Sequence, residues 1–362
     1  MLEPAPLPPP DREIRVALIG YGLAGRLFHA PLIEAVPAMR LTTVVTANEE
    51  RAAQVRRRHP GARVLSGAEQ LFERASEHDL VVVAAPNRYH APLATAALEA
   101  GLHTVVDKPM ALTAAEARAL AATARGSGRL LSVFHNRRLD AEILTLRRLI
   151  DEGALGEVVR VDSRFDRWRP SLRGGWREQE DAAAGGGLLL DLGSHLVDQA
   201  LHLFGPPRQV YAELACRRPG AVVEDDVFIA LHYPGGLDVH LSAGMLAVAP
   251  APRLRAVGDR GSYVRETLDV QEDALRAGTP VHPGWGIEPP ALWGRLVDET
   301  GSRAVESEPG AWPRFYTEVA AAIRGEGPPP VAADEAVAVM ELLDAARHSA
   351  SEGVAVSGWS EG

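Results

Sequence analysis

The chain has 362 residues, and 38 basic against 48 acidic side chains give a net charge of −10 at pH 7. Its length exceeds the usual one-domain range of about 100–200 residues, which predicts two domains. Hydrophobic residues make up 46% of the chain and charged residues 24%, a composition that excludes the disordered and fibrous classes. The acidic balance excludes a broad electrostatic footprint for nucleic acid or an anionic membrane.

Targeting signals and cysteine usage point to the cytoplasm. Five of the first ten residues are proline, so we expect residues 1–12 to form an extended tail and not a secretion leader. No run of 18 or more residues is uniformly apolar, which makes a membrane span unexpected. Cys216 is the only cysteine, so an internal disulfide and a thiolate metal cluster are excluded, and we expect this side chain to fill a core position.

The first part of the chain alternates short apolar runs with helical patterns. Strands are predicted at Ile14–Ile19, Leu41–Thr46, Leu80–Ala85, His103–Val106 and Leu130–Phe134, and helices at Leu23–Val36, Glu49–Arg58, Pro92–Ala100 and Ala114–Arg125. Continuous apolar strands that alternate with helices are typical of a parallel sheet covered on both faces. Residues 13–134 are therefore predicted to form an α/β domain with a doubly wound parallel sheet.

After His135 the pattern changes, and residues 135–362 are predicted to form a second domain. Helices are expected at Ala141–Glu152, Leu188–Phe204, Trp312–Arg324 and Asp334–Ala350, and strands at Gln209–Cys216, Val227–His232, Leu237–Ala243, Arg253–Gly258 and Gly261–Arg265. Strands that follow one another directly predict an α+β domain with a large, mostly antiparallel open sheet. The segment Leu268–Val297 is rich in Gly and Pro and is expected to be irregular.

A GxGxxG motif follows the first predicted strand and opens a helix. In that position the glycines allow a tight turn and a close approach of the backbone to a pyrophosphate, and the helix N-terminus supplies N–H donors. The loop predicts a dinucleotide site formed by Gly20, Tyr21, Gly22, Leu23, Ala24 and Gly25.

The residues at the end of the second predicted strand indicate whether NAD or NADP binds. An NAD site usually has an acidic residue there to accept hydrogen bonds from the ribose, but this chain has Thr46, Ala47 and Asn48, and Arg51 follows on the next helix. This pattern favours NADP(H), with NAD(H) as the alternative. Arg51 could instead be a solvated helix charge, or Glu49 or Glu50 could reach the ribose.

A polar stripe runs along an otherwise apolar helix in the second half. Asp191, His195, Asp198 and His202 lie within about 60° of one another at about 100° per residue. Buried carboxylates and imidazoles are costly unless they are paired or functional, so we expect Asp191 and His195 to line a reactive cavity. Asp198 and His202 are either further site residues or structural partners. No third metal ligand is evident from the spacing, so no metal site is expected.

Two further predicted strands end in polar residues. Lys108 follows the strand that begins at His103, and Pro86 and Asn87 follow the strand before it. The carboxyl ends of strands in a doubly wound sheet face the ligand crevice, so these residues are expected at the cofactor. Lys108 could otherwise be an ordinary surface lysine.

Three motifs in this order resemble the glucose-fructose oxidoreductase and inositol dehydrogenase superfamily. They are Gly20–Gly25, Asp107-Lys108-Pro109, and Gly186-Gly187-x3-Asp191-x-Gly193-x-His195-x2-Asp198. Five shorter runs are similar to the branch that contains NADP-dependent scyllo-inositol dehydrogenases: Gly22–Pro31, His135–Arg138, Phe165–Pro170, Trp176–Glu178 and Gln271–Leu275.

The resemblance implies an N-terminal Rossmann domain and a C-terminal domain whose open sheet mediates homodimers or homotetramers. It also implies that Lys108, Asp191 and His195 form the catalytic group. The chain departs from the common Glu-Lys-Pro of this superfamily, because Asp107 is one methylene shorter than glutamate.

These observations together predict an oxidoreductase that exchanges hydride between a nicotinamide and a secondary alcohol or ketone of a polyol, inositol or sugar. His195 is expected to take the hydroxyl proton and Lys108 to stabilise the alkoxide. Candidate substrate residues are Asn136, Trp168, Arg169 and Trp176, although the two tryptophans could equally fill a domain interface. The alternatives are a glycoside hydrolase that retains its nicotinamide and a regulator that senses the nucleotide without chemistry.

Overall fold

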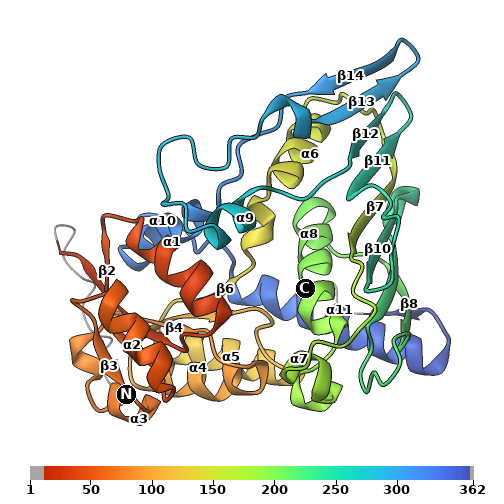
Figure 1. Ribbon diagram of the computed structural model, residues 1–362. Helices are drawn as coiled ribbons and strands as arrows, with labels where there is room; N and C mark the ends of the chain where they lie inside the picture. Colours follow the sequence, from red (N-terminus) through yellow and green to blue (C-terminus); the bar gives the residue numbers. More distant parts are fainter. Residues whose placement is uncertain (1–11, 359–362) are drawn as a thin grey trace. The chain divides into compact units, whose positions relative to one another are not determined.

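The computed structural model describes residues 12–358, which divide into two compact units (Figure 1). The first unit comprises residues 12–135, Glu272–Pro283 and Trp312–Val337. The second comprises Asn136–Gln271, Gly284–Ala311 and residues 338–358. The chain therefore leaves the first unit at His135 and returns to it twice. The tail expected over 1–12 lies outside the described residues except for Arg12.

The first unit is built on a parallel sheet of six strands among the described residues, in the order β3-β2-β1-β4-β5-β6. The strands are β1 (Ile14–Ile19), β2 (Met39–Val45), β3 (Arg63–Leu65), β4 (Leu80–Val83), β5 (His103–Asp107) and β6 (Leu131–Phe134). All residues of β4, β5 and β6 are buried, as expected for a sheet covered on both faces. This order reverses between β1 and β4, which confirms the predicted doubly wound sheet.

Right-handed crossovers place α1 and α2 on one face of this sheet and α4 and α5 on the other (Figure 1). The helices that follow the strands are α1 (Ala30–Glu34), α2 (Glu49–Arg58), α3 (Ala68–Phe72), α4 (His90–Glu99) and α5 (Ala114–Ser127). Thr113 caps α5 by accepting from the main-chain N–H of Glu116, and Gly128 ends it at φ 62°. The helix α10 (Trp312–Ile323) also belongs to this unit, where Trp312 packs edge-on against Phe28.

The second unit contains a mixed sheet with the strand order β14-β13-β12-β11-β7-β10-β9-β8-β15 among the described residues. Its strands are β7 (Val158–Asp166), β8 (Gln209–Ala215), β9 (Asp226–His232), β10 (Asp238–Gly244), β11 (Leu254–Gly258), β12 (Ser262–Arg265), β13 (Gly294–Asp298), β14 (Gly301–Val305) and β15 (Val356–Ser357). Only the β7–β10 pair is parallel within this described sheet, which confirms the mostly antiparallel prediction.

Helices pack on one face of the second sheet. They are α6 (Ala141–Asp151), α7 (Trp176–Gln179), α8 (Ser194–Phe204) and part of α11 (Ala333–Glu352), while the short α9 (Gln271–Arg276) begins at the boundary between the units. Apolar side chains of α6 and α8, such as Ile143 and Leu196, face Val239 and Leu241 of β10. This apolar layer holds α8 against the middle of the sheet.

The structure differs from the sequence-based expectations in several places, and the short strand β3 and helix α3 were among the elements not predicted. The central strand β7 was not among the predicted strands, and β13 and β14 lie in and after the segment that was expected to be irregular. Cys216 is exposed, so the prediction that it fills a core is wrong; it lies just past the end of β8, where the chain leaves the sheet. Within residues 12–358, no helix has the length and apolar character needed to cross a bilayer.

Candidate active site

The glycine loop after β1 has the geometry of a phosphate cradle. Gly20 has a φ of 97°, and a Cβ there would overlap the carbonyl oxygen of Ala84. A Cβ on Gly25 would overlap the carbonyl oxygen of Gly20. A Cβ on Gly22, in contrast, would meet no atom of the described chain within 4 Å. The space above Gly22 is what a pyrophosphate needs, so these residues fit a dinucleotide.

The helix that follows the loop is not a regular α-helix from its start. A π-helical turn spans Gly25–His29 before α1, and Arg26 N–H closes the first turn on the carbonyl of Gly22 at 3.0 Å. The positive end of this helix, formed by Leu23, Ala24 and Gly25, is therefore at the loop. π-Helical turns of this kind often occur at functional sites.

Tyr21 is the one residue of the loop whose side chain is turned into the protein. It is buried, and its hydroxyl lies 2.8 Å from Nε2 of His59, whose Nδ1 lies 2.5 Å from a carboxylate oxygen of Glu34. Burial raises the pKa of Tyr21. Its side chain thus links the loop to Glu34 of α1 and to His59 at the end of α2.

The residues after β2 form an exposed, hydrogen-bonded turn. Asn48 caps α2 by accepting from the main-chain N–H of Arg51 at 2.9 Å, and its own N–H donates to Oγ1 of Thr46 at 3.4 Å. Asn48 and Arg51 are exposed and Thr46 is half-buried. Glu49 and Glu50 are also exposed in the first turn of α2, so the geometry places both the donors and these acids at the same helix end.

At the end of β5, Asp107 is buried among cationic and imidazole groups. Its Oδ1 accepts from the main-chain N–H of Lys108 at 2.9 Å and lies 3.8 Å from Nε2 of His29. Burial alone raises the pKa of Asp107, but His29, His90 and Lys108 outweigh it and hold this pKa at about 2. Asp107 therefore stays ionised directly beside the half-buried Lys108.

His90 connects the two strand ends that carry Asn87 and Lys108. It is buried, its Nδ1 lies 2.7 Å from the carbonyl oxygen of Pro109, and its Nε2 lies 2.8 Å from that of Ala85. The loop Ala85–Asn87 and the turn after Asp107 are thereby held together, with Asn87 buried in the first 3₁₀ turn after β4. His29 and His90 were missed by the sequence reasoning, although a histidine inside an apolar helical run is a usable signal.

In the second unit, Asp191 and His195 lie on one helical segment, as predicted. A π-helical turn over Leu189–Gly193 leads into α8, and Asp191 N–H donates to the carbonyl of Gly187 at 3.2 Å. His195 is buried, and its ring is 6.4 Å from that of Phe165 on β7. The side chain of Asp191 is 23% exposed and faces a cavity of about 210 Å³.

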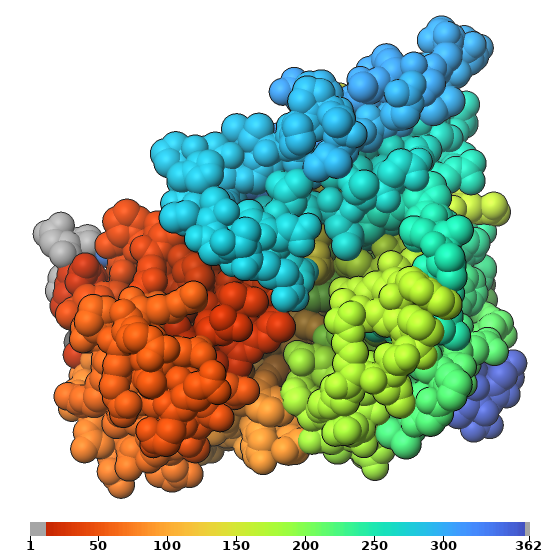
Figure 2. Space-filling view, in the orientation of Figure 1, coloured from red at the N-terminus to blue at the C-terminus, as the bar shows by residue number. Residues whose placement is uncertain are grey.

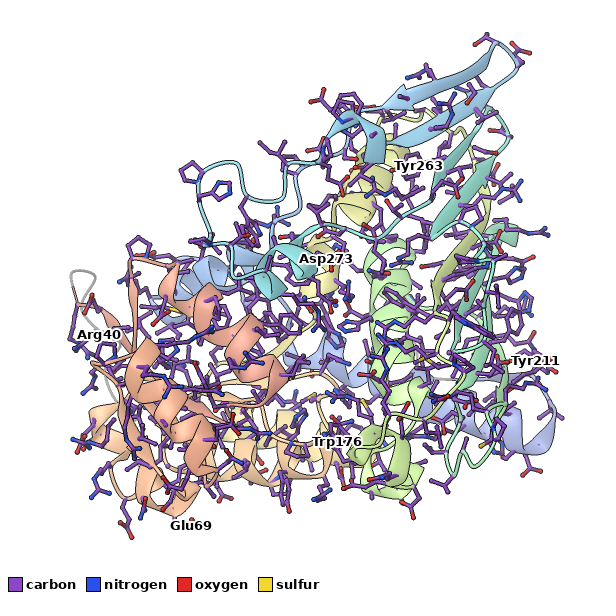
Figure 3. All side chains as sticks on the ribbon, viewed as in Figure 1. Arg40, Glu69, Trp176, Tyr211, Tyr263 and Asp273 are labelled. Atoms are coloured by element: carbon purple, nitrogen blue, oxygen red, sulfur yellow. The ribbon has the colours of Figure 1, made fainter. Side chains whose placement is uncertain are left out.

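The cavity is lined by the segment before α8, by the turn after β8 and by the end of β10. Its residues are Arg167, Arg169, Leu172, Arg173, Gly174, Gly175, Trp176, Arg177, Glu178, Gly187, Leu188, Asp191, Arg218, Ala221, Val223, Glu224, Asp225 and Met245. Two of the four candidate substrate residues, Arg169 and Trp176, are among them, and Figure 3 shows Trp176 at the start of α7. The other two candidates, Asn136 and Trp168, are not among the described residues that line the cavity. Asn136 is buried, and Trp168 is 54% exposed and forms a β-bridge with Leu246.

The rest of the predicted polar stripe has a structural role or lies at the surface. Asp198 is buried and accepts from Arg138 in a bidentate pair, with Nη2 2.7 Å and Nε 2.9 Å from its carboxylate oxygens. His202, one turn further on, is exposed. Asp198 therefore has a buried charge partner within the second unit. The three residues expected to catalyse are divided, with Lys108 in the first unit and Asp191 and His195 in the second.

Two family models match the chain, and together they span most of it. Residues 14–135 match the oxidoreductase family with an NAD-binding Rossmann fold, and residues 143–264 match the GFO/IDH/MocA C-terminal domain. The chain belongs to the GFO/IDH/MocA oxidoreductase family. The family resemblance expected from the sequence motifs is therefore confirmed.

Individual members of the GFO/IDH/MocA family are similar over almost the whole chain. The oxidoreductase YdgJ of Escherichia coli K12 is 44% identical over 93% of this chain and 96% of its own length. The scyllo-inositol 2-dehydrogenase (NADP(+)) IolW of Bacillus subtilis 168 is 36% identical over 94% of each chain. The solved structure of the oxidoreductase YPO2259 from Yersinia pestis is 40% identical, covers 97% of this chain and 99% of its own, and superposes with a TM-score of 0.90.

Proposed function

We propose that this member of the GFO/IDH/MocA oxidoreductase family is an NADP-dependent dehydrogenase that acts on a secondary alcohol of a polyol, inositol or sugar. The observation that carries the proposal is the placement of Asp191 and His195 on one buried helical segment, with Asp191 at a cavity that also has Trp176 and Arg177. A carboxylate, an aromatic face and a guanidinium in one cavity are suited to a polyhydroxylated ring. The similarity to the scyllo-inositol dehydrogenase supports this substrate class.

The first unit would hold the cofactor through the carboxyl ends of its strands. The backbone of Gly20, Gly22 and Gly25 would bind the pyrophosphate, and Pro86 and Asn87 would border the nicotinamide half together with Lys108. When bound, the nicotinamide supplies the hydride acceptor or donor.

His195 and Lys108 have complementary roles in the proposed reaction. The imidazole of His195 accepts the proton of the reacting hydroxyl as a general base. The ammonium of Lys108 stabilises the negative charge that develops on the same oxygen, and its positive charge attracts the ionised carboxylate of Asp107. Asp191 accepts hydrogen bonds from substrate hydroxyls in the cavity.

The preference for NADP rests on the turn after β2. Thr46 and Asn48 offer donors, Arg51 adds a cation at the same helix end, and no acidic residue occupies positions 46–48. A helix N-terminus together with a guanidinium favours a phosphate over a ribose hydroxyl.

The decisive experiment follows nicotinamide absorbance at alkaline pH, with NADP and NAD separately, against inositols, aldoses and other polyols. Reduction of NADP by a polyol in the wild type, with loss of that activity in Lys108→Met and unchanged cofactor binding, supports the proposal. Retained turnover in Lys108→Met overturns the role of Lys108. Release of a sugar without net cofactor reduction would identify a glycoside hydrolase that retains its nicotinamide, and silence with tight cofactor binding would indicate a sensor.

We also propose that the chain forms a homodimer or homotetramer through the sheet of the second unit. Along β10 the residues alternate between buried and half-buried, so Asp238, His240 and Ser242 lie on the face opposite Val239 and Leu241. Sedimentation equilibrium tests this assembly, and a monomer at micromolar concentration would contradict it.

A further inference from the structure

A glycine-bounded segment, Arg173–Gly187, lies next to the cavity of the second unit, and we refer to it as the strap. It contains α7 and lies at the surface, where Figure 2 shows it in yellow-green. Gly174 and Gly175 open α7 with φ of 74° and 104°, and Gly187 closes the strap at φ 98°. A Cβ on Gly186 would overlap the carbonyl oxygen of Glu180, so both ends of the strap depend on glycine.

A buried arginine, Arg218, holds the strap through an ion pair with Glu178. The side chain of Arg218 is only 3% exposed, and it donates to Glu178 on α7 at 2.9 Å and to Asp225 at 2.8 Å. Glu178 also accepts from the main-chain N–H of Arg173 at 2.7 Å. Burial raises the pKa of Glu178, but the hydrogen bonds from Arg218 and Arg173 more than offset it and keep the carboxylate ionised.

The anchored glutamate determines where the preceding residue points. Arg177 lies directly before Glu178, and its main-chain carbonyl accepts from Gly187 N–H at 3.0 Å. Its guanidinium lies over the ring of Trp176 at 4.3 Å from the centroid, which limits its rotamers. From this position Nε of Arg177 contacts Oδ1 of Asp191 at 3.1 Å.

We propose that Arg177 is a positioning residue that orients Asp191 for the proposed dehydrogenation, with Glu178 and Arg218 as the fixed base of this arrangement. The inference rests on the proposed function, since it assigns Asp191 to substrate hydroxyls. A guanidinium in contact with a carboxylate limits the rotation of the carboxylate and so defines the direction in which it accepts hydrogen bonds from substrate. Misplacing such a group by about 1 Å can cost about a hundredfold in rate.

The kinetic test compares Arg177→Met and Arg177→Lys with Arg208→Met, which removes the same charge from an exposed position just before β8 in the same unit. We expect kcat of Arg177→Met to fall about tenfold to a hundredfold, with partial recovery in Arg177→Lys and no change in Arg208→Met or in NADP binding. A loss of less than threefold, a Lys variant no better than the Met variant, or an effect confined to KM would overturn the positioning role.

A second readout does not depend on turnover. Mass spectrometry follows the modification of individual arginines by phenylglyoxal in the wild type and in Asp191→Asn. We expect Arg177 to react several times more slowly than the exposed Arg208 in the wild type and to lose this protection in Asp191→Asn. Equal rates in both proteins would overturn the contact. If the wild type oxidises no polyol while Arg177 is protected, the proposed function fails and the pairing of Arg177 with Asp191 stands.

Discussion

His29 faces Asp107 in the first unit, with its Nε2 3.8 Å from Oδ1 of the carboxylate. The other ring nitrogen, Nδ1, lies 2.6 Å from the hydroxyl of Tyr316 on α10. His29, from the helical turn after the glycine loop, thus links Asp107 to Tyr316 of α10. The neighbouring His29 and His90, together with Lys108, keep the pKa of Asp107 low despite its burial.

Replacement of Asp107 by Asn should destabilise the protein in a pH-dependent way. The pKa of Asp107 is about 2 in the folded protein against 3.8 for an ordinary aspartate, so ionisation favours folding. This contribution, about 2 kcal/mol, is fully present above pH 4 and is lost as the pH falls through about 2. Denaturant unfolding at pH 7, 5 and 3 measures it. A stability difference between wild type and Asp107→Asn that does not shrink from pH 5 to pH 3 would contradict the ionised pair.

Alanine at two glycines of the loop should affect two different properties, cofactor binding at Gly22 and thermal stability at Gly25. A Cβ on Gly22 meets no described atom within 4 Å, so Gly22→Ala should fold with an unchanged Tm but bind NADP at least tenfold more weakly, since the methyl occupies phosphate space. A Cβ on Gly25 overlaps the carbonyl oxygen of Gly20, so Gly25→Ala should lower Tm. Thermal melts and fluorescence titration of cofactor check both variants. Normal cofactor binding by Gly22→Ala would place the dinucleotide elsewhere.

Replacement of Arg51 by Ala should reduce the preference for NADP. If Arg51 contacts the 2′-phosphate, its loss removes one charge-assisted contact and raises KM for NADP about tenfold, while KM for NAD stays the same. Arg56→Ala is the matched control, because Arg56 is an exposed arginine of the same helix α2. Equal effects of both variants on NADP would show that Arg51 is only a solvated charge.

Removal of one partner of the buried pair between Arg138 and Asp198 should be costly. Asp198→Asn removes the bidentate carboxylate partner of Arg138 in a site where both side chains are at most 6% exposed, which should cost about 3–5 kcal/mol of unfolding free energy. The exposed pair Arg125–Asp334 provides the comparison, and Asp334→Asn there should cost less than about 1 kcal/mol. Denaturant unfolding at pH 7 measures both, and similar costs would be inconsistent with the burial of Arg138.

The sequence predicted the first sheet well because buried parallel strands appear as continuous apolar runs. It did not predict β7, in which charged residues such as Arg160, Asp162 and Arg164 alternate with Val161 and Phe165. Such a strand has one polar and one apolar face, and only its neighbours β10 and β11 make its central position evident. The hairpin of β13 and β14 was missed because most of β14 is exposed and lacks an apolar signal.

The residue types of the candidate site were determined by the sequence alone, through the glycine loop, Lys108, and the spacing of Asp191 and His195 on one helix. These features are local, since each depends on residues within one turn or one strand end. The partners of these residues were decided by the tertiary structure: His29 and Asp107, Arg138 and Asp198, Arg218 and Glu178. Each pair joins positions at least 40 residues apart in the sequence. A buried charged or polar group needs a partner, but burial does not determine which residue that partner is. The partners could therefore be identified only from the packing of the helices and strands.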